Sequence, residues 1–485
     1  MRKLHNRLRN GTIRTTIKNP LSILMFVPGS AVGLATGRPR LGNAGHWRTV
    51  RGGGVSGRMV HLRNEIAVFR RCSRSMRILL IANMVYAFVF PVLEIFVSAY
   101  VMRNSHDESR VFTYQLSLYA ATPVAFFVNG ILLGRVGAKH LYAAGMVLSG
   151  VAMIMLMQSG VLTLAGIAAS GVAMGMATGL FWANRGFLAL ATTSNANRNY
   201  YYGAELFVAT LASIAVPALV GWFIAGASLY GWSGGTANRA YREVAIGVFA
   251  LTLFSAFLVE RGTFRNPSQA RFLYFSFHPL WRRMLQLSAL KGLAQGYMLT
   301  VPPMLILLLV GQEGTLGVTQ AAGGVLSALI LYAAGRAAAP RHRRLVFNAG
   351  LLLFLLGSLS TSLLFNEAGA LIFVACLMLA KPLLDLSYNP IEFEVVEALA
   401  QHEGRSEYAY LFNHELGLFA GRFAGCTLFL AIAHWASGIA ALKYAVPVIA
   451  LLQLLSIPVA NQIALGLKAV GFVSHPRAAH AGVES

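Results

Sequence analysis

The chain has 485 residues, of which 56% are hydrophobic and 12% are charged, and its mean hydropathy is +0.61. A soluble domain carries about 25% charged residues, so this composition excludes an ordinary soluble protein. The formal net charge of +23 would suit a nucleic-acid-binding protein. The basic residues, however, lie in an N-terminal arm and in alternate loops, which is the positive-inside pattern of a membrane protein, so nucleic acid is not an expected partner.

The basic arm covers residues 1–76 and contains no Asp or Glu before Glu65. Such a segment cannot bury a core, and we expect it to be disordered or to lie on the cytoplasmic membrane surface. A signal peptide remains an alternative, because a basic start precedes an apolar stretch at 21–34. A third alternative is that the natural start is Met59 and that residues 1–58 do not belong to the mature protein.

Twelve apolar runs follow the arm, and each is long enough to cross the roughly 30 Å hydrocarbon core as a helix. The expected spans are 78–102, 113–134, 141–158, 161–187, 204–226, 243–259, 285–311, 315–335, 345–365, 368–389, 410–434 and 440–465. The runs do not alternate apolar and polar residues as barrel strands do. The predicted fold class is therefore an all-α polytopic membrane protein of twelve transmembrane helices.

The distribution of arginine and lysine between the loops predicts the topology. Alternate loops hold most of the basic residues, which places both termini in the cytoplasm, and a bacterial inner membrane is the expected location. The longest of these loops lies between spans six and seven. It predicts an N-terminal six-helix bundle at 77–260, a cytoplasmic linker at 261–284, a C-terminal six-helix bundle at 285–467 and a cytoplasmic tail at 468–485.

The two expected halves resemble each other at an offset near 210 residues. Tyr86 and Tyr297 lie 211 positions apart, and each is followed by a proline five residues later. Glu205 and Glu415 lie 210 positions apart, at the starts of spans five and eleven. Parallel repeats of this kind place a binding site near the membrane midplane, between two pseudo-symmetric halves that rock against each other.

The loop after span two resembles the signature of the major facilitator superfamily, G-x-x-x-D-[RK]-x-G-R-[RK]. The matching residues are Gly130, Arg135, Gly137 and Lys139. The sequence departs from the pattern where glycine replaces the usual aspartate and alanine replaces an arginine, which puts the usual charge relay to the neighbouring helix in doubt. The resemblance covers about 78–465. It implies a monomer with alternating access and one substrate site in a central cavity, and it names no substrate.

Charged residues within membrane spans are costly and mark functional sites. Glu94, three residues after Pro91, is a candidate for proton coupling, and its alternative is a carboxylate paired with a neighbouring helix. Arg422 lies near the middle of span eleven and needs an anion. That anion is either a carboxylate such as Glu415 or a bound substrate.

Further polar and aromatic residues fall in the spans or at their ends. The substrate-cavity candidates, besides Arg422, are Lys291, Gln295, Asn129, Tyr86 and Tyr297, each of which is otherwise a helix-packing residue. The candidates for a cytoplasmic gate are Arg185, Arg198, Glu205, Glu392 and Glu415. Gly417, Gly421 and Gly425 recur every four residues, which predicts close helix packing.

These features favour a proton-coupled secondary transporter of a small organic solute, with the lipid bilayer as its surroundings. The alternatives are a non-transporting or lipid-moving protein on the same scaffold and a membrane-embedded transferase. The sequence contains no P-loop, nucleophile elbow or acyltransferase spacing, so we expect neither an ATP-driven pump nor an enzyme. Its three cysteines have no CxxC spacing, and we expect no metal and no cofactor.

Overall fold

The computed structural model describes residues 69–158, 162–193, 197–264, 274, 276–311, 313–337, 343–405 and 407–469. Most of the arm expected at 1–76, the start at Met59 and the tail after 469 lie outside this part of the chain, whereas residues 69–76 of that arm are described and include the start of a helix at Arg74. Throughout the described ranges the secondary structure is helical, with no strand.

Twelve helical spans in the described residues are long and apolar enough to cross a membrane, which confirms the predicted fold class. The first six are formed by α2 (Arg74–Ala87) with η2 (Val92–Phe96) and α3 (Val97–Ser105), α4 (Glu108–Val136), α5 (Ala138–Gln158), α6 (Leu164–Thr192), α7 (Arg198–Leu229) and α8 (Ala237–Glu260). The second six are formed by α9 (Pro279–Leu305) with η4 (Ile306–Val310), α10 (Glu313–Ala337), α11 (Arg343–Leu364), α12 (Glu367–Glu403), α13 (Glu407–Trp435) and α14 (Gly438–Gln453) with α15 (Ser456–Ala469).

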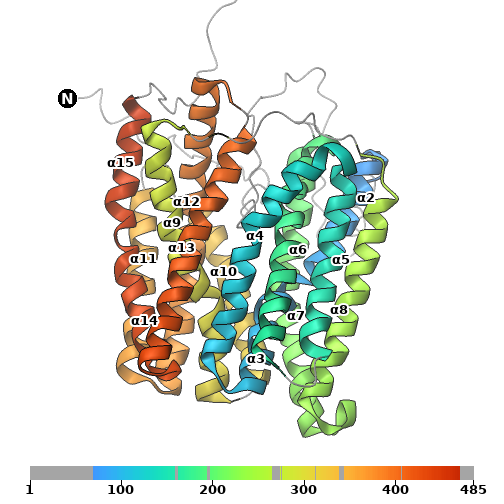
Figure 1. Ribbon diagram of the computed structural model, residues 1–485, viewed down its shortest axis with the longest axis vertical. Coiled ribbons are helices and arrows are strands. Elements are labelled where there is room, and N and C mark those ends of the chain that lie inside the picture. Colours follow the sequence, from blue (N-terminus) through green and yellow to red (C-terminus); the bar gives the residue numbers. More distant parts are fainter. Residues whose placement is uncertain are drawn as a thin grey trace, which may run out of the picture.

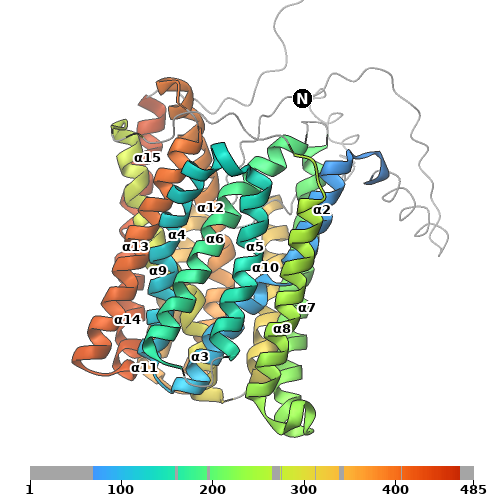
Figure 2. The same ribbon diagram turned by 45° about the vertical axis from the view of Figure 1, so that its right-hand side comes forward.

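The helices run side by side and form two groups, α2 to α8 and α9 to α15 (Figures 1 and 2). Within the first group α6 packs against α4 and α5, and within the second group α12 packs against α11 and α13 against α9. The groups meet where α4 contacts α13 and where α7 contacts α10. Helices from distant parts of the chain therefore form the boundary at which the sequence repeat predicts a binding site.

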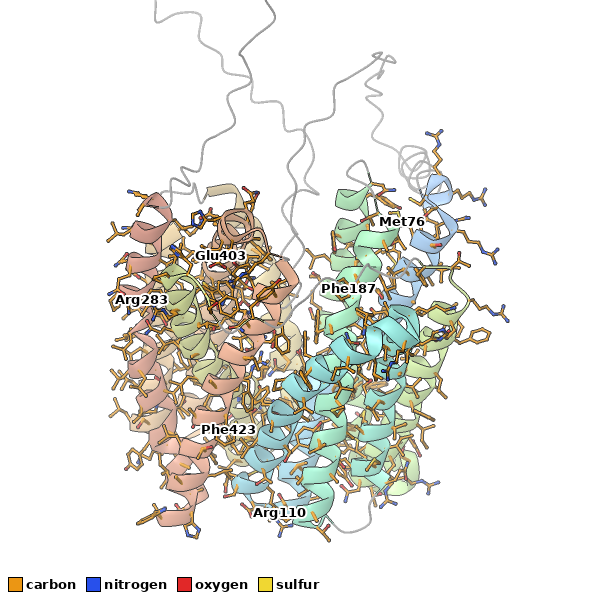
Figure 3. The ribbon with its side chains drawn as sticks, turned by 45° about the horizontal axis from the view of Figure 1, so that its top comes forward. Met76, Arg110, Phe187, Arg283, Glu403 and Phe423 are labelled. Carbon is orange, nitrogen blue, oxygen red and sulfur yellow. The ribbon has the colours of Figure 1, made fainter. Side chains whose placement is uncertain are left out.

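The two ends of the bundle differ in charge. We call the end at which α2 begins the basic side, because Arg74, Arg261, Arg283 and Arg343 lie at helix ends there. Figure 3 shows Arg283 toward this end and Arg110 at the other end, which we call the opposite side.

The helix ends differ from the expected span ends. Helix α12 continues to Glu403, well beyond the apolar run at 368–389, although Pro390 lies within it. It ends at Gly404, whose φ of 61° is in the left-handed region. An apolar run marks the part of a helix that lies within the bilayer, whereas capping residues determine where the helix itself ends. The charged residues after Asn389 therefore lie on the same helix as the apolar span.

Prolines interrupt the first helix of each group. In the first group, π-helical η2 begins directly after Pro91, and in the second, π-helical η4 follows Pro302 and Pro303. Proline lacks the backbone N–H that a helix interior uses, so the hydrogen-bond ladder is broken nearby. The two groups share this irregularity as well as the Tyr-Pro spacing seen in the sequence.

Glycines allow α13 to lie directly against α9, as their spacing predicts. A Cβ atom on Gly421 would overlap the backbone carbonyl oxygen of Ala289, and one on Gly417 would overlap the Ser288 hydroxyl. Helix α6 approaches α4 in the same way through Gly175, where a Cβ would overlap the Leu118 carbonyl oxygen. Small residues therefore set the closest helix contacts in both groups.

We expect Gly421→Ala to destabilise the protein by about 1–3 kcal/mol, because the new methyl group must push α9 and α13 apart. The measurement is the melting temperature of purified protein in detergent. The control is Gly247→Ala on α8, where a Cβ atom meets nothing within 4 Å, and where the helix gains about 0.5–1 kcal/mol from losing a glycine. Equal melting temperatures for the two variants would contradict the packing described for α9 and α13.

Candidate functional site

The first polar cluster lies inside the first group of helices and consists of Asn83, Tyr142, Arg185, Tyr201 and Glu205. Arg185 Nη2 lies 2.8 Å from Glu205 Oε2, and both side chains are 7% exposed. Asn83 donates to Glu205 Oε1 at 2.8 Å and to the Tyr201 hydroxyl oxygen at 2.9 Å. The Tyr142 hydroxyl donates to Asn83 Oδ1 at 2.7 Å. These bonds join α2, α5, α6 and α7 to one another.

The second polar cluster lies among α9, α12 and α13. Its members are Lys291, Gln295, Asp385, Tyr388, Asn389, Glu392, His414, Glu415 and Arg422. Each cluster is therefore built within one group of helices: the first cluster within the first group, and the second cluster within the second. The second cluster contains more charged side chains than the first.

Lys291 is the cation of the second cluster that α9 contributes. Its Nζ lies 3.5 Å from Asp385 Oδ1 and donates to Asn389 Oδ1 at 3.2 Å. The ammonium also lies 3.9 Å from the ring centre of Tyr388. Three side chains of α12 thus hold the lysine that the sequence offers as a cavity residue.

Arg422 is the cation of the second cluster that α13 contributes, and it is 11% exposed. Its Nε and Nη2 both donate to Gln295 Oε1, at 3.1 and 2.8 Å. Its Nη1 lies 3.5 Å from Glu415 Oε2. The arginine therefore has both a neutral acceptor and a carboxylate as partners.

Arg422 also reaches the other group of helices. Its guanidinium carbon lies 5.0 Å from the ring centre of Tyr119 on α4. Glu94 and Arg422 both lie within electrostatic range of the Tyr119 hydroxyl. Glu94 is an exposed residue of η2, and no hydrogen bond or ion pair of its carboxylate is found among the described residues. The two charges that the sequence singles out thus belong to different groups and lie within electrostatic range of the same tyrosine.

The remaining cavity candidates lie in packed surroundings. Asn129 is fully buried and accepts a hydrogen bond from Asn184 of α6. Tyr86 is buried and shares a hydrogen bond of 2.8 Å with Ser149. Tyr297 is buried, and its hydroxyl donates to the Gly425 carbonyl at 2.7 Å. The structure does not bring these three side chains to Arg422 and Glu94.

The gate candidates pair within each group. Arg185 bonds Glu205 in the first polar cluster, whereas Glu392 and Glu415 bond residues of the second. No described contact of these four side chains crosses between the groups. The side chain of Arg198 lies outside the described part of the structure.

The loop that carries the family signature lies on the basic side. Gly130 is buried in α4, Arg135 is exposed, and Gly137 has a φ of 85°, which favours glycine. Lys139 Nζ lies 3.7 Å from Glu260 Oε2 at the end of α8. The lysine thus has a carboxylate partner from a neighbouring helix even though the aspartate of the signature is absent.

Contacts toward the opposite side join the two groups. Arg103 of α3 forms an ion pair with Glu313 of α10, whose side chain is buried. The rings of Phe112 on α4 and Phe429 on α13 stack with centroids 3.6 Å apart. A Cβ atom on Gly221 of α7 would lie 2.7 Å from the Glu313 carbonyl oxygen. On this side the helices of the two groups are in close contact.

His414, Tyr388 and Asn389 are cluster members that the sequence did not single out. His414 stands directly before Glu415, and an ionisable residue in an apolar run is itself a signal. Within the described residues no group of three or more His, Cys, Asp or Glu side chains is placed to hold a metal ion.

We expect Arg185 and Glu205 to be strongly coupled, because removing one partner of a buried ion pair costs about 3–5 kcal/mol. Arg185→Met and Glu205→Met should each lower the melting temperature, and the double variant should lose much less than the sum. The control cycle uses Arg239 and Glu243, an exposed pair at 3.5 Å on α8, where coupling should be at most about 1 kcal/mol. Additive losses at Arg185 and Glu205 would contradict the pairing.

No known protein family model matches the chain. The Bacillus subtilis (strain 168) protein named "Uncharacterized protein YqgE" is 21% identical over 368 residues, which cover 74% of this chain and 83% of that protein. The structure of a bacterial metal transporter is similar with a TM-score of 0.55 and 14% identity, over 81% of this chain and 99% of that chain. At this identity the likeness shows the fold alone: the chain shares the fold of that protein, and its described residues form twelve membrane-length helices.

Proposed function

We propose that the protein is a secondary active transporter of the major facilitator type that moves a small organic solute, coupled to protons, by alternating access. The observation that carries the proposal is the contact of Arg422 with Tyr119 of the other group, with Glu94 within electrostatic range of the same hydroxyl. Charge within a membrane span is costly and marks a path for substrates or ions. A solute bound there would contact both groups, as alternating access requires.

The arrangement of contacts between the groups supports alternating access. Arg103 with Glu313, and Phe112 with Phe429, join the groups toward the opposite side. The gate candidates toward the basic side pair within one group or the other. We propose that this is a state closed on the opposite side, and that the six-helix bundles at 77–260 and 285–467 rock about the contact between them.

The loop charges support an orientation. We propose that the basic side faces the cytoplasm of a bacterium, because arginine and lysine accumulate on that side of inner-membrane proteins. Both chain ends and the linker at 261–284 are then cytoplasmic. We also propose that one chain is sufficient for transport, because both groups that form the site belong to it.

The side chains around Tyr119 favour an organic solute. Glu94 and Arg422 offer one charge of each sign, and Gln295 offers an amide. The fold is shared with a metal transporter, but the described residues contain no group of three typical ligands. These groups suit transport, and we propose no enzymatic activity.

The test begins with a thermal-stability screen of the purified protein against a panel of metabolites, siderophores and drugs. A ligand of the native state raises the melting temperature by mass action. We expect uptake of that solute into proteoliposomes to follow an imposed pH gradient, and Glu94→Gln to remove this dependence while retaining solute exchange. The control is Glu243→Gln on the exposed surface of α8.

An unchanged response of Glu94→Gln to the gradient would contradict the proposed role of this carboxylate in coupling. If no stabilising solute is transported by the wild type, the proposal of a transporter is itself contradicted.

We expect Glu313→Gln to open the opposite side, because it removes the ion pair with Arg103. Cys426 reports the opening, since it is buried beside Tyr119 and Gly296. In a protein with Cys72 and Cys376 replaced by serine, a membrane-impermeant maleimide added on that side should label Cys426 about fivefold faster, as a loss of roughly 1 kcal/mol implies.

The control for this measurement is Glu367→Gln, an exposed carboxylate at the opposite-side end of α12. If Cys426 is labelled at the same rate in Glu313→Gln and in the parent protein that keeps Glu313, the Arg103–Glu313 contact does not hold this side closed.

A further inference from the structure

His414 is a buried residue of the second polar cluster that the proposed function does not use. Both of its ring nitrogens have partners: Nε2 lies 2.6 Å from the Tyr388 hydroxyl, and Nδ1 lies 3.2 Å from Glu392 Oε1. His414 is 5% exposed and Glu392 is 8% exposed. A carboxyl, an imidazole and a phenol thus lie in succession between α12 and α13, joined by one hydrogen bond to Tyr388 and one ion-pair contact to Glu392.

The charges of the second polar cluster do not balance. Lys291 is paired with Asp385, and Arg422 is paired with Glu415, each at 3.5 Å. The third carboxylate, Glu392, has only the imidazole as its described ion-pair partner. With a neutral imidazole the cluster therefore has one net negative charge, and a buried charge without compensation is costly. One added proton makes the cluster neutral.

The charged and titratable groups around His414 come from α9, α12 and its own helix. Helix α9 contributes Lys291, and α12 contributes Tyr388 and Glu392, with Asp385 within electrostatic range of Tyr388. The helix of His414 itself contributes Glu415 and Arg422. On α4, Tyr119 contacts Arg422. The lysine of α14, Lys443, lies elsewhere, 6.0 Å from the ring centre of Phe365.

The geometry accommodates the added proton without a charged imidazole. With Glu392 ionised, His414 Nδ1–H donates to the carboxylate and Nε2 accepts from the Tyr388 hydroxyl. A proton arriving at Nε2 lets the Nδ1 proton pass to Glu392, and the carboxyl then donates to Nδ1. Nε2–H now donates to the Tyr388 oxygen, whose own proton turns away. The imidazole changes tautomer and stays neutral, as the nearby Lys291 and Arg422 favour.

We propose that Glu392 and His414 form a second, buried proton-binding site, separate from Glu94, in which Glu392 holds the proton and His414 relays it. Its part in transport rests on the proposed function, whereas proton binding itself does not. Protonation changes the net charge beside Lys291 and Arg422, and Glu415, the partner of Arg422, is the residue next to His414. The site is thus adjacent to the residue that contacts the first group of helices.

The test is an infrared titration of the full-length protein in lipid, which follows the C=O stretch of protonated buried carboxyls as the pH falls. We expect Glu392→Gln to lack one titrating carboxyl band that the wild type shows. The matched control is Glu394→Gln, because Glu394 is on the same helix and pairs with Arg343 at 2.9 Å near the basic side. The control should retain the band. A wild-type set of bands in Glu392→Gln would overturn the proposal.

A second variant tests the relay. His414→Gln keeps the carboxyl of Glu392 but removes the imidazole, so its band should remain and its titration midpoint should move by about one pH unit, a tenfold change in proton affinity. An unmoved midpoint would show that His414 takes no part. If Glu392→Gln does not fold, Glu392→Asp serves instead, and the same band should change frequency.

The outcomes separate this proposal from the proposed function. A band that titrates in a protein without gradient-driven uptake would contradict proton-coupled transport and leave the proton site intact. If the pH gradient drives uptake but the titrating carboxyl bands are the same in the wild type and in Glu392→Gln, the proton site is rejected and the proposed transport function stands.

Discussion

A guanidinium that is removed from water inside an apolar bundle needs an anion or several acceptors close by. Two arginines in the interior of the described bundle satisfy that requirement in different ways. Arg185 has Glu205 beside it, and the pair is enclosed by four helices of one group. Arg422 has Gln295 and a more distant Glu415, and its remaining face lies over Tyr119 of the other group. The first arrangement is complete within its group, whereas the second extends to the boundary between the groups.

Because of this difference, we assign different roles to the polar clusters of the two groups of helices. The first polar cluster joins α2, α5, α6 and α7 to one another through buried hydrogen bonds and an ion pair. The second polar cluster has three carboxylates, two fixed cations and a histidine in a small volume. Its hydrogen bonds depend on where its protons are, which is the basis of the proton site proposed above. We attribute the structural role to the first cluster and the responsive role to the second.

The sequence predicted the class of fold well, because twelve apolar runs are a direct consequence of bilayer thickness. It placed the end of the apolar span at Asn389 but not the end of α12 at Glu403, since the end of a helix depends on local capping. Glu94 and Arg422 were found as isolated charges, but their approach to Tyr119 depends on how α4 packs against α13. Likewise, Tyr388 and Glu392, the partners of His414, lie at most 26 positions away in sequence but on another helix, α12. Their contact with His414 therefore depends on how α12 and α13 pack.

The irregular segments after Pro91 and after Pro302 affect how the bundle can deform. A continuous α-helix resists bending because each carbonyl along it is tied to an N–H four residues on. At Phe88 and Val89 the backbone instead makes short turns to Val85 and Tyr86, and a wider coil follows at η2. Span one is thus two stiff rods joined by a compliant joint, and span seven has its own wide coil at η4. The two joints differ in position, because η2 is followed by α3 within span one, whereas η4 ends span seven at Val310. Of these two spans, span one therefore has a helical part beyond its joint, toward the opposite side, that can tilt as a lever.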